Sequence, residues 1–473
     1  MTSLPSGAAP LPRKRRGVEL IMIVLALLIA LGAYIIVGLT MDGEVPPSLL
    51  GYALGMSALA AIVHVVVRLK APYADPLLVP IAVFLNGFGL VMISRLDTSM
   101  VKVGQIDKGV APTQLIWTTL AIALFCGVLF LIPEPRVLQR YTYIFGLAGL
   151  IFIALPALLP ASISEVNGAK IWIRIGPLGI QPAEFGKVAL LIFFAGYLVS
   201  KRDVLSLAGK RLLFIDLPRA RDLGPILIAW FASLLVMVFE SDFGTALLFF
   251  GMFLVVLYVA TQRISWIIIG MGMFVAGAAL AFALIAHIPF LASKLAHVLL
   301  RVDIWLHPFA GDNPTNHAYQ LVQGLYALGA GGVLGTGLGQ GRPYMVPFSN
   351  TDFIMTSIGE ELGLTGIMAL LLVYALFVER GMRTALAARD PFVKLFACGL
   401  SFSIVLQLFV VVGGVTRLIP LTGLTTPFLS YGGSSLLAQW IIVALLVRMS
   451  DNARRPAPQA AQNEGMTQVV STR

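Results

Sequence analysis

Two opposite charges lie three residues apart in an otherwise apolar stretch. Glu184 and Lys187 follow Pro182, and a proline in the first turn fits the start of a helix. Their spacing places both side chains on one helix face, where each partly neutralises the other in a medium of low dielectric constant. Two interpretations stay open: an ion pair that holds two helices, or a charged wall of a substrate cavity. Asp242 and Arg417, near the ends of other apolar stretches, allow the same two interpretations.

The segment 287–354 has the highest density of side chains suited to chemistry. Its polar and ionisable residues, with two glutamates that follow it, are Arg301, Asp303, His307, Asp312, Tyr319, Gln320, Gln323, Arg342, Asp352, Glu360 and Glu361. Seven of the thirteen residues from Gly329 to Gly341 are glycine. Such a run lets the backbone approach a ligand or form tight re-entrant turns. The alternative is a flexible surface loop.

Three other patterns carry little chemical meaning. The stretch Gly335 to Gly339 follows no predicted strand, so it is no dinucleotide-binding motif, and Asp242-Phe-Gly lacks the other motifs of a kinase. Four of the five histidines recur every tenth residue, which matches neither one helix face nor a zinc site; they are His287, His297, His307 and His317.

Composition sets the class of protein. Of 473 residues, 58% are hydrophobic and 12% charged, and the mean hydropathy is +0.91. A soluble domain carries about twice that charged fraction, so soluble, disordered and disulfide-rich classes are excluded. The net charge of +10 indicates basic cytoplasmic loops beside an anionic membrane, not nucleic-acid binding. Cys126 and Cys398 lie in apolar stretches and are interpreted as small buried hydrophobic residues.

The apolar stretches predict an all-α, polytopic membrane protein of about twelve transmembrane helices. Their expected ranges are 17–40, 48–68, 76–95, 112–132, 139–160, 183–200, 223–239, 243–262, 264–286, 355–378, 392–415 and 430–449. The basic run Arg13 to Arg16 precedes the first helix, which we interpret as a retained signal anchor with the N-terminus inside. An even number of helices then returns the C-terminus to the cytoplasm, and lysine and arginine gather in the loops expected inside.

This topology divides the chain into four parts. Residues 1–16 form a basic cytoplasmic N-terminus, 17–75 two additional helices, 76–450 the membrane core, and 451–473 a disordered cytoplasmic tail. Two loops face outwards, 161–182 and the larger 287–354, and the larger is expected to carry function.

An outward-facing enzyme has no access to cytoplasmic nucleotides, so a biosynthetic reaction there needs a lipid-linked donor. Glycosyl transfer from a polyprenyl pyrophosphate needs a carboxylate base, positive charge for the pyrophosphate, and a groove for the lipid tail. Asp312 can supply the base, and the basic residues Arg174, Lys187, Arg301 and Arg417 can supply the charge.

Several segments together resemble the RodA/FtsW/SpoVE family, the SEDS proteins of bacterial wall synthesis. They run in order over residues 76–450 and are Asn167–Trp172, Gly176–Lys187, Asp242–Thr245, Tyr319–Gly324 with the glycine run, Asn350–Ile354, Gly359–Gly363, Pro420–Gly423 and Pro427–Ser435. The chain most resembles the elongation (RodA) branch of high-GC Gram-positive bacteria. Thr422 stands where the FtsW branch often has lysine, which favours RodA.

The resemblance implies peptidoglycan glycosyltransferase activity. Such an enzyme polymerises lipid II on the outer face of the cytoplasmic membrane during elongation, with a class B penicillin-binding protein as partner and membrane lipids around it. A divalent cation, Mg²⁺ or Mn²⁺, is the only cofactor that we expect. The family core has ten helices, so 17–40 and 48–68 are an N-terminal addition.

The resemblance also assigns residues. The essential aspartate of the family corresponds to Asp312, the expected general base of an inverting transfer, although Asp312-Asn-Pro replaces the usual Asp-Pro. Asp303 stands where the family pattern has no acid. The expected substrate-binding residues are Arg174, Glu184, Lys187, Asp242, Arg301, Tyr319, Gln320, Gln323, Asp352, Glu360, Arg417, Ser434 and Ser435.

Two alternatives belong to other functional classes. Charges within the bilayer often mark translocation routes, so Glu184, Lys187 and Asp242 also fit a lipid II flippase. A non-catalytic scaffold for the penicillin-binding partner is the third hypothesis.

Overall fold

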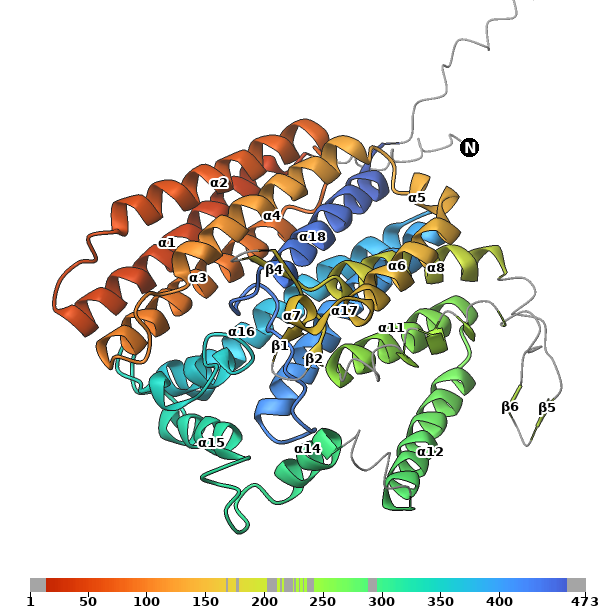
Figure 1. Cartoon of the computed structure of the whole chain (residues 1–473). Coiled ribbons are helices and arrows are strands. Elements are labelled where there is room, and N and C mark those ends of the chain that lie inside the picture. The colour runs from red at the N-terminus through yellow and green to blue at the C-terminus, as the bar shows by residue number, and fades with distance from the viewer. Residues whose placement is uncertain are drawn as a thin grey trace, which may run out of the picture.

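The computed structural model is a bundle of long helices (Figure 1). The structure describes residues 14–166, 169–175, 178–201, 242–287 and 296–456, and positions 211–212, 215–216, 224, 227–228, 230–232 and 234–235. Its long helices are α1 (Arg16–Asp42), α2 (Leu49–Lys70), α3 (Leu78–Lys102), α4 (Ala111–Leu131), α6 (Thr142–Leu158), α8 (Ala183–Ser200), α11 (Phe243–Thr261), α12 (Ser265–His287), α16 (Ile354–Ala387), α17 (Pro391–Val415) and α18 (Gly433–Arg454).

Shorter elements connect these helices. The short helices are α5 (Val137–Arg140), α7 (Ala161–Ser164), α14 (Ala296–Leu306), α15 (Tyr319–Gly331) and the 3₁₀ turn η1 (Pro343–Met345). Three antiparallel pairs are the strands found in the described residues: β1 (Glu165–Val166) with β2 (Ala169–Lys170), β3 (Ile173–Ile175) with β4 (Leu178–Ile180), and β5 (Arg211–Leu212) with β6 (Ile215–Asp216).

Nine of the described helices are long and apolar enough to cross a membrane. Two shorter apolar helices, Thr142–Leu158 and Ser265–Leu280, coincide with predicted spans, and the predicted span 223–239 lies mostly outside the described residues. The predicted helical, polytopic membrane fold is therefore confirmed, whereas the number twelve stays a prediction.

Polar side chains join the central helices to one another. In the most apolar part of α18, 94% of residues are buried inside the protein, against 33% in α1 and in α2. The amide of Asn86 on α3 accepts a hydrogen bond from the indole of Trp440 on α18 (3.1 Å). It also donates to Thr118 on α4 (3.3 Å). Peripheral helices instead expose leucine, isoleucine and valine, as expected for contact with lipid tails.

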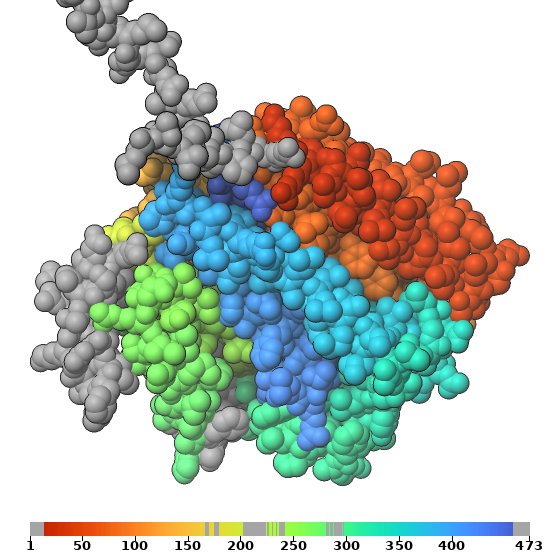
Figure 2. Space-filling model, turned by 180° about the vertical axis from the view of Figure 1, so that it is seen from behind, coloured from red at the N-terminus to blue at the C-terminus, as the bar shows by residue number. Residues whose placement is uncertain are grey.

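The N-terminal helices α1 and α2 pack against α3 and α4. They form one flank of the protein, red and orange in Figure 2, with α11 and α12 in green on the opposite flank. Glu19 is fully buried and accepts hydrogen bonds from Arg16 and His64, so one carboxylate joins the first turn of α1 to α2.

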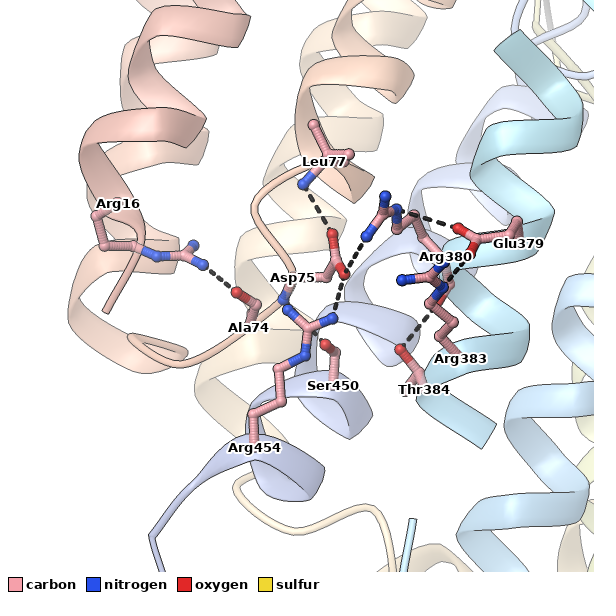
Figure 3. Close-up of polar contacts among 10 residues, drawn as sticks. All are labelled: Arg16, Ala74, Asp75, Leu77, Glu379, Arg380, Arg383, Thr384, Ser450 and Arg454. Atoms are coloured by element: carbon pink, nitrogen blue, oxygen red, sulfur yellow. Dashed lines mark hydrogen bonds and ion pairs between the residues drawn. The ribbon is translucent and has the colours of Figure 1, made fainter. Parts of the chain in front are cut away.

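One end of the bundle is closed by a cluster of charges around Asp75 (Figure 3). The buried carboxylate of Asp75 pairs with Arg454 at the end of α18 and lies 3.9 Å from Arg380 on α16. Its second oxygen accepts a hydrogen bond from the Leu77 amide at 2.9 Å. Arg16, at the start of α1, donates to the neighbouring Ala74 carbonyl, so the first and last described helices meet at this end.

Asp75→Asn is expected to destabilise the protein. The substitution removes a buried charge partner of Arg454, which costs about 1–3 kcal/mol for a charged hydrogen bond. Thermal unfolding in detergent measures the loss. Asp42→Asn is the matched control, because Asp42 pairs with Lys102 while both side chains are about half exposed (50% and 47%). Equal melting temperatures for the two variants would contradict a stabilising role for Asp75.

Several predicted boundaries differ from the structure. The predicted span 76–95 ends at Arg95, but α3 continues to Lys102 because Arg95 is buried and pairs with Glu361 (2.9 Å). The helix expected to end at 378 continues to Ala387, and α18 extends into the predicted tail as far as Arg454. The predicted loop 287–354 contains α14 and α15. Residues 1–13 and 457–473 lie outside the described residues.

Candidate active site

The pair Glu184–Lys187 lies on α8 inside the bundle. Their side chains are 8% and 3% exposed, and the Lys187 ammonium lies 2.5 Å from the Glu184 carboxylate. Lys187 also donates to the amide oxygen of Gln407 on α17 (2.9 Å), which accepts a second bond from Gln439 on α18 (3.2 Å). Lys187 therefore joins α8 to α17, and Gln407 joins α17 to α18. The cavity-wall interpretation stays a prediction.

Asp242 extends the polar region of Glu184. It is the N-cap of α11, and its carboxylate accepts a hydrogen bond from the Thr245 amide (3.0 Å), which satisfies one free N–H at the helix start. The Gln181 side chain reaches the other carboxylate oxygen at 3.4 Å. The charges of Glu184 on α8 and of Arg301 on α14 both act on Asp242.

Arg301 also acts on Asp352, which directly precedes α16. The Asp352 carboxylate is half-buried and accepts a hydrogen bond from the Thr351 hydroxyl (2.9 Å). Burial raises the pKa of Asp352 above its usual value, and the Thr351 bond and the positive charge of Arg301 oppose that rise. The charge of one arginine thus acts on two carboxylates from different elements.

The start of α18 borders the same region. The Gln181 backbone amide donates to the Ser434 hydroxyl (2.8 Å), and Ser435 is buried. The β3–β4 hairpin, which ends just before Gln181, packs with β4 against α18. Arg174 lies on β3 of this hairpin and is exposed.

Part of the glycine-rich stretch packs against the start of α16, while its interpretation as a flexible surface loop stays a prediction. Gly335 has φ +84°, and a Cβ there would lie 2.3 Å from the Glu361 carbonyl oxygen. The amides of Thr336 and Gly337 donate to the carbonyls of Glu360 and Glu361, both at 2.9 Å. The positive φ and the close approach explain why glycine is needed.

Glu360 belongs to this packed region and not to the group around Asp242. Its carboxylate accepts the Arg342 amide at 2.8 Å. Its neighbour Glu361 accepts the Gly339 amide at 2.9 Å and pairs with the buried Arg95. Arg95 also donates to the Gly339 and Gly341 carbonyls at 3.1 and 2.9 Å, so this arginine joins α3 to the glycine-rich stretch.

Three further predicted residues lie on α15. Gln320 donates to the Pro347 carbonyl at 3.2 Å, Gln323 is half-buried, and Tyr319 is exposed. They follow directly after the turn that carries Asp312, so α15 sets where that turn ends.

Asp312 lies in the turn between α14 and α15. Its carboxylate is exposed, while its backbone carbonyl accepts the Thr315 hydroxyl (3.2 Å) and the Asn316 amide (3.1 Å). The next residue, Asn313, donates to the Asp303 carboxylate at 3.0 Å. The hydrogen bonds from Asn313 and His307 hold the pKa of Asp303 below its usual value.

Arg417 is engaged with α14. Its guanidinium donates to the carbonyls of Trp305 (2.8 Å) and Leu306 (2.9 Å), and its own carbonyl accepts the Trp305 indole N–H (3.1 Å).

The structure therefore brings together only part of the predicted set. We call Glu184, Lys187, Asp242, Arg301, Asp352 and Ser434 the connected polar region. Glu184 pairs with Lys187, Gln181 hydrogen-bonds to both Asp242 and Ser434, and the charge of Arg301 acts on Asp242 and Asp352. Sequence reasoning missed Gln407, Gln439 and Arg95. Polar residues within apolar stretches were a usable signal, but among the residues of those stretches the sequence analysis did not weigh these two uncharged amides or Arg95.

No group of three or more His, Cys, Asp or Glu side chains that could hold a metal ion occurs in the described residues. Mg²⁺ is often held by one or two carboxylates together with substrate phosphates. Glu184 and Asp242 are the neighbouring carboxylates that fit that pattern, so the divalent cation stays a prediction.

Comparison with known proteins decides the family. The FtsW/RodA/SpoVE family of cell cycle proteins matches residues 76–455, which is most of the chain. The chain belongs to this family. This SEDS chain is also 50% identical to the peptidoglycan glycosyltransferase RodA of Mycobacterium tuberculosis, over 98% of this chain and 96% of that protein. The helices α1 and α2 precede the matched range.

Other relatives are more distant. The stage V sporulation protein E of Bacillus subtilis is 33% identical over 64% of this SEDS chain and 77% of that protein. A chain of a solved peptidoglycan synthase complex, described as coordinating polymerization and crosslinking, superposes with a TM-score of 0.60 at 25% identity. That match covers 81% of this chain and 99% of the other.

Proposed function

We propose that this chain polymerises lipid II into glycan strands on the outer face of the bacterial cytoplasmic membrane during cell elongation. Its activity is that of a peptidoglycan glycosyltransferase of the RodA group. The observation that carries this conclusion is 50% identity to mycobacterial RodA over 98% of the chain. We propose the identity of the acceptor, the outer face of the membrane as the place of reaction, and the roles of individual residues.

The proposed transfer uses Asp312 as the general base. Its carboxylate accepts the proton of the attacking hydroxyl while that oxygen bonds to the anomeric carbon of the donor. The bond from this carbon to the pyrophosphate breaks at the same time, and polyprenyl pyrophosphate leaves. Direct displacement inverts the anomeric centre, so an α-linked donor gives a β-linked glycan. The exposure of Asp312 supports this role, because the carboxylate is free to meet a substrate.

The pyrophosphate needs positive charge as it leaves. We assign this task to Lys187 and Arg301, which border the connected polar region. The remaining carboxylates keep these cations in place: Glu184 pairs with Lys187, and Asp242 and Asp352 lie within reach of the charge of Arg301. A bound Mg²⁺ or Mn²⁺ would add further positive charge at the pyrophosphate.

A class B penicillin-binding protein is the proposed partner. The solved synthase complex that the chain resembles is described as coordinating polymerization with crosslinking, which requires a second activity beside polymerisation. We also propose that both termini are cytoplasmic. Basic residues gather at the end of the bundle where α1 begins and α18 ends, including Arg380, Arg383 and Arg454.

Reconstituted vesicles test the reaction against the flippase alternative. Fluorescent lipid II is added to vesicles with the purified chain and its partner, and both polymer formation and movement between leaflets are recorded. Polymerisation without accelerated movement is the expected result. Movement without polymer would support the flippase, which Glu184, Lys187 and Asp242 motivate. Neither activity from a folded sample would support the scaffold.

A further inference from the structure

The C-terminus of α17 carries arginine at a position where glycine is the usual residue. Thr416 is the C-cap, and Arg417 after it has φ +65°. The Leu418 amide donates to the Gly413 carbonyl (2.7 Å) and the Arg417 amide to the Gly414 carbonyl (3.2 Å). These two bonds define a Schellman motif, in which the left-handed residue is most often glycine. A residue with a side chain is strained in this conformation, so it persists only where the surrounding contacts favour it.

The contacts of the Arg417 side chain favour arginine at this position. The last carbonyls of a helix have no partner within it, and the guanidinium of Arg417 donates to two of them on α14, Trp305 and Leu306. The positive charge also complements the negative end of the α14 dipole. The Trp305 indole returns a bond to the Arg417 carbonyl, so the two segments, 112 positions apart, hold each other reciprocally.

The turn that carries Asp312 is tied to the same end of α14. Asn313 donates from its side chain to the His307 carbonyl (2.9 Å) and to the Asp303 carboxylate (3.0 Å). The Ala318 amide closes the turn on the Asn313 carbonyl (2.9 Å). The stretch 303–318 is therefore one hydrogen-bonded piece, and Arg417 joins it to the end of the core helix α17.

We infer that Arg417 is a positioning residue, which fixes the α14 end and thereby the Asp312 turn over the bundle, and not a cation that binds substrate. The inference rests on the proposed role of Asp312. The planar guanidinium can donate to two carbonyls at once in a fixed geometry, whereas a lysine ammonium at the end of a flexible chain cannot. A comparison of arginine with lysine at position 417 therefore distinguishes a positioning role from a role that needs only a positive charge.

Arg417→Gly and Arg417→Lys provide the test, with lipid II polymerisation measured as kcat and KM. Glycine suits the left-handed backbone, so the glycine variant keeps a melting temperature close to that of the wild type. Both variants are expected to lower kcat by about 10- to 10²-fold, the range of a misplaced catalytic group, with KM changed by less than about twofold. Hydrogen exchange is expected to accelerate at the amides of His307, Asn316 and Ala318.

Gln262→Gly is the matched control. Gln262 is another non-glycine residue with positive φ (56°) at a helix end, and within the described ranges its side chain donates to the Val259 carbonyl of the same helix end. Its replacement relieves the same backbone strain without touching α14, so wild-type kcat is expected. Trp305→Phe removes the reciprocal bond, and combining it with Arg417→Gly is expected to add no further loss, since both act on one contact.

Two results would overturn the inference. If Arg417→Lys keeps wild-type activity while Arg417→Gly mainly raises KM, Arg417 binds substrate as a cation. If Arg417→Gly polymerises like the wild type, Arg417 does not position the site. Failure of the proposed function is distinguishable from both, because Asp312→Asn would then polymerise normally whatever Arg417 does.

Discussion

Asp312→Asn is expected to abolish lipid II polymerisation while the protein folds and inserts normally. The carboxamide has the shape of the carboxylate but cannot accept the proton of the attacking hydroxyl. Loss of a general base costs about 10² to 10⁴ in rate. Folding is expected to survive because the Asp312 side chain is exposed and the turn is held through its backbone carbonyl. Polymer is measured on gels, and folding by the melting temperature in detergent.

Asp107→Asn is the matched control for this substitution. Asp107 is an exposed aspartate in the connection between α3 and α4, in which Gln105 donates to the Tyr344 carbonyl (3.0 Å) of the segment after α15. Its replacement removes one exposed carboxylate without affecting the turn 307–318, so full activity is expected. Comparable losses from both variants would mean that the general charge of this face matters, and not the position of Asp312.

Lys187→Met is expected to impair both stability and activity. The substitution leaves the Glu184 carboxylate buried without its 2.5 Å partner. Breaking a buried pair costs roughly 3–5 kcal/mol of the free energy of unfolding. Polymerisation is expected to fall as well, because we propose that the positive charge of Lys187 stabilises the leaving pyrophosphate. Arg136→Met is the control for stability, since the Arg136–Asp390 pair is largely exposed (74% and 26%) and its loss is expected to cost little.

The double variant Glu184→Gln/Lys187→Met separates the two roles of the pair. Removing both charges leaves no unpaired ion, so most of the stability is expected to return. Activity is expected to stay low, because the cation is still missing. If activity recovers together with stability, the pair only holds helices, and the cavity-wall interpretation is wrong.

The membrane helices were largely predictable, because the apolar character that a membrane span needs is a property of each residue and is visible without knowledge of tertiary contacts. The span 183–200 coincides with α8, which begins directly after Pro182. The predicted start at 243 coincides with that of α11, where Asp242 caps the helix. The prediction failed at Arg95, because a charge at the end of an apolar stretch indicates a boundary unless its partner is known. That partner, Glu361, comes from a distant helix.

The candidate site was predictable by residue type more than by arrangement. Glu184, Asp242 and Asp352 were identified as unusual, but which of them share Arg301 depends on tertiary packing. Arg417 shows the limit most clearly. As a sequence feature it is a lone cation near the end of a membrane helix, and its partners on α14 lie 111 and 112 positions away. The short helices α14 and α15 were missed because neither reaches the length of a membrane span.

The central claim is that this chain itself forms glycan strands, and one measurement tests it most directly. Purified wild-type protein, together with the proposed class B penicillin-binding partner, is incubated with lipid II and a divalent cation. Moenomycin is added to silence contaminating transglycosylases of the other class. Polymer from the wild type, and none from Asp312→Asn, is the predicted result. A folded wild-type sample that leaves lipid II as monomer under these conditions would contradict the claim.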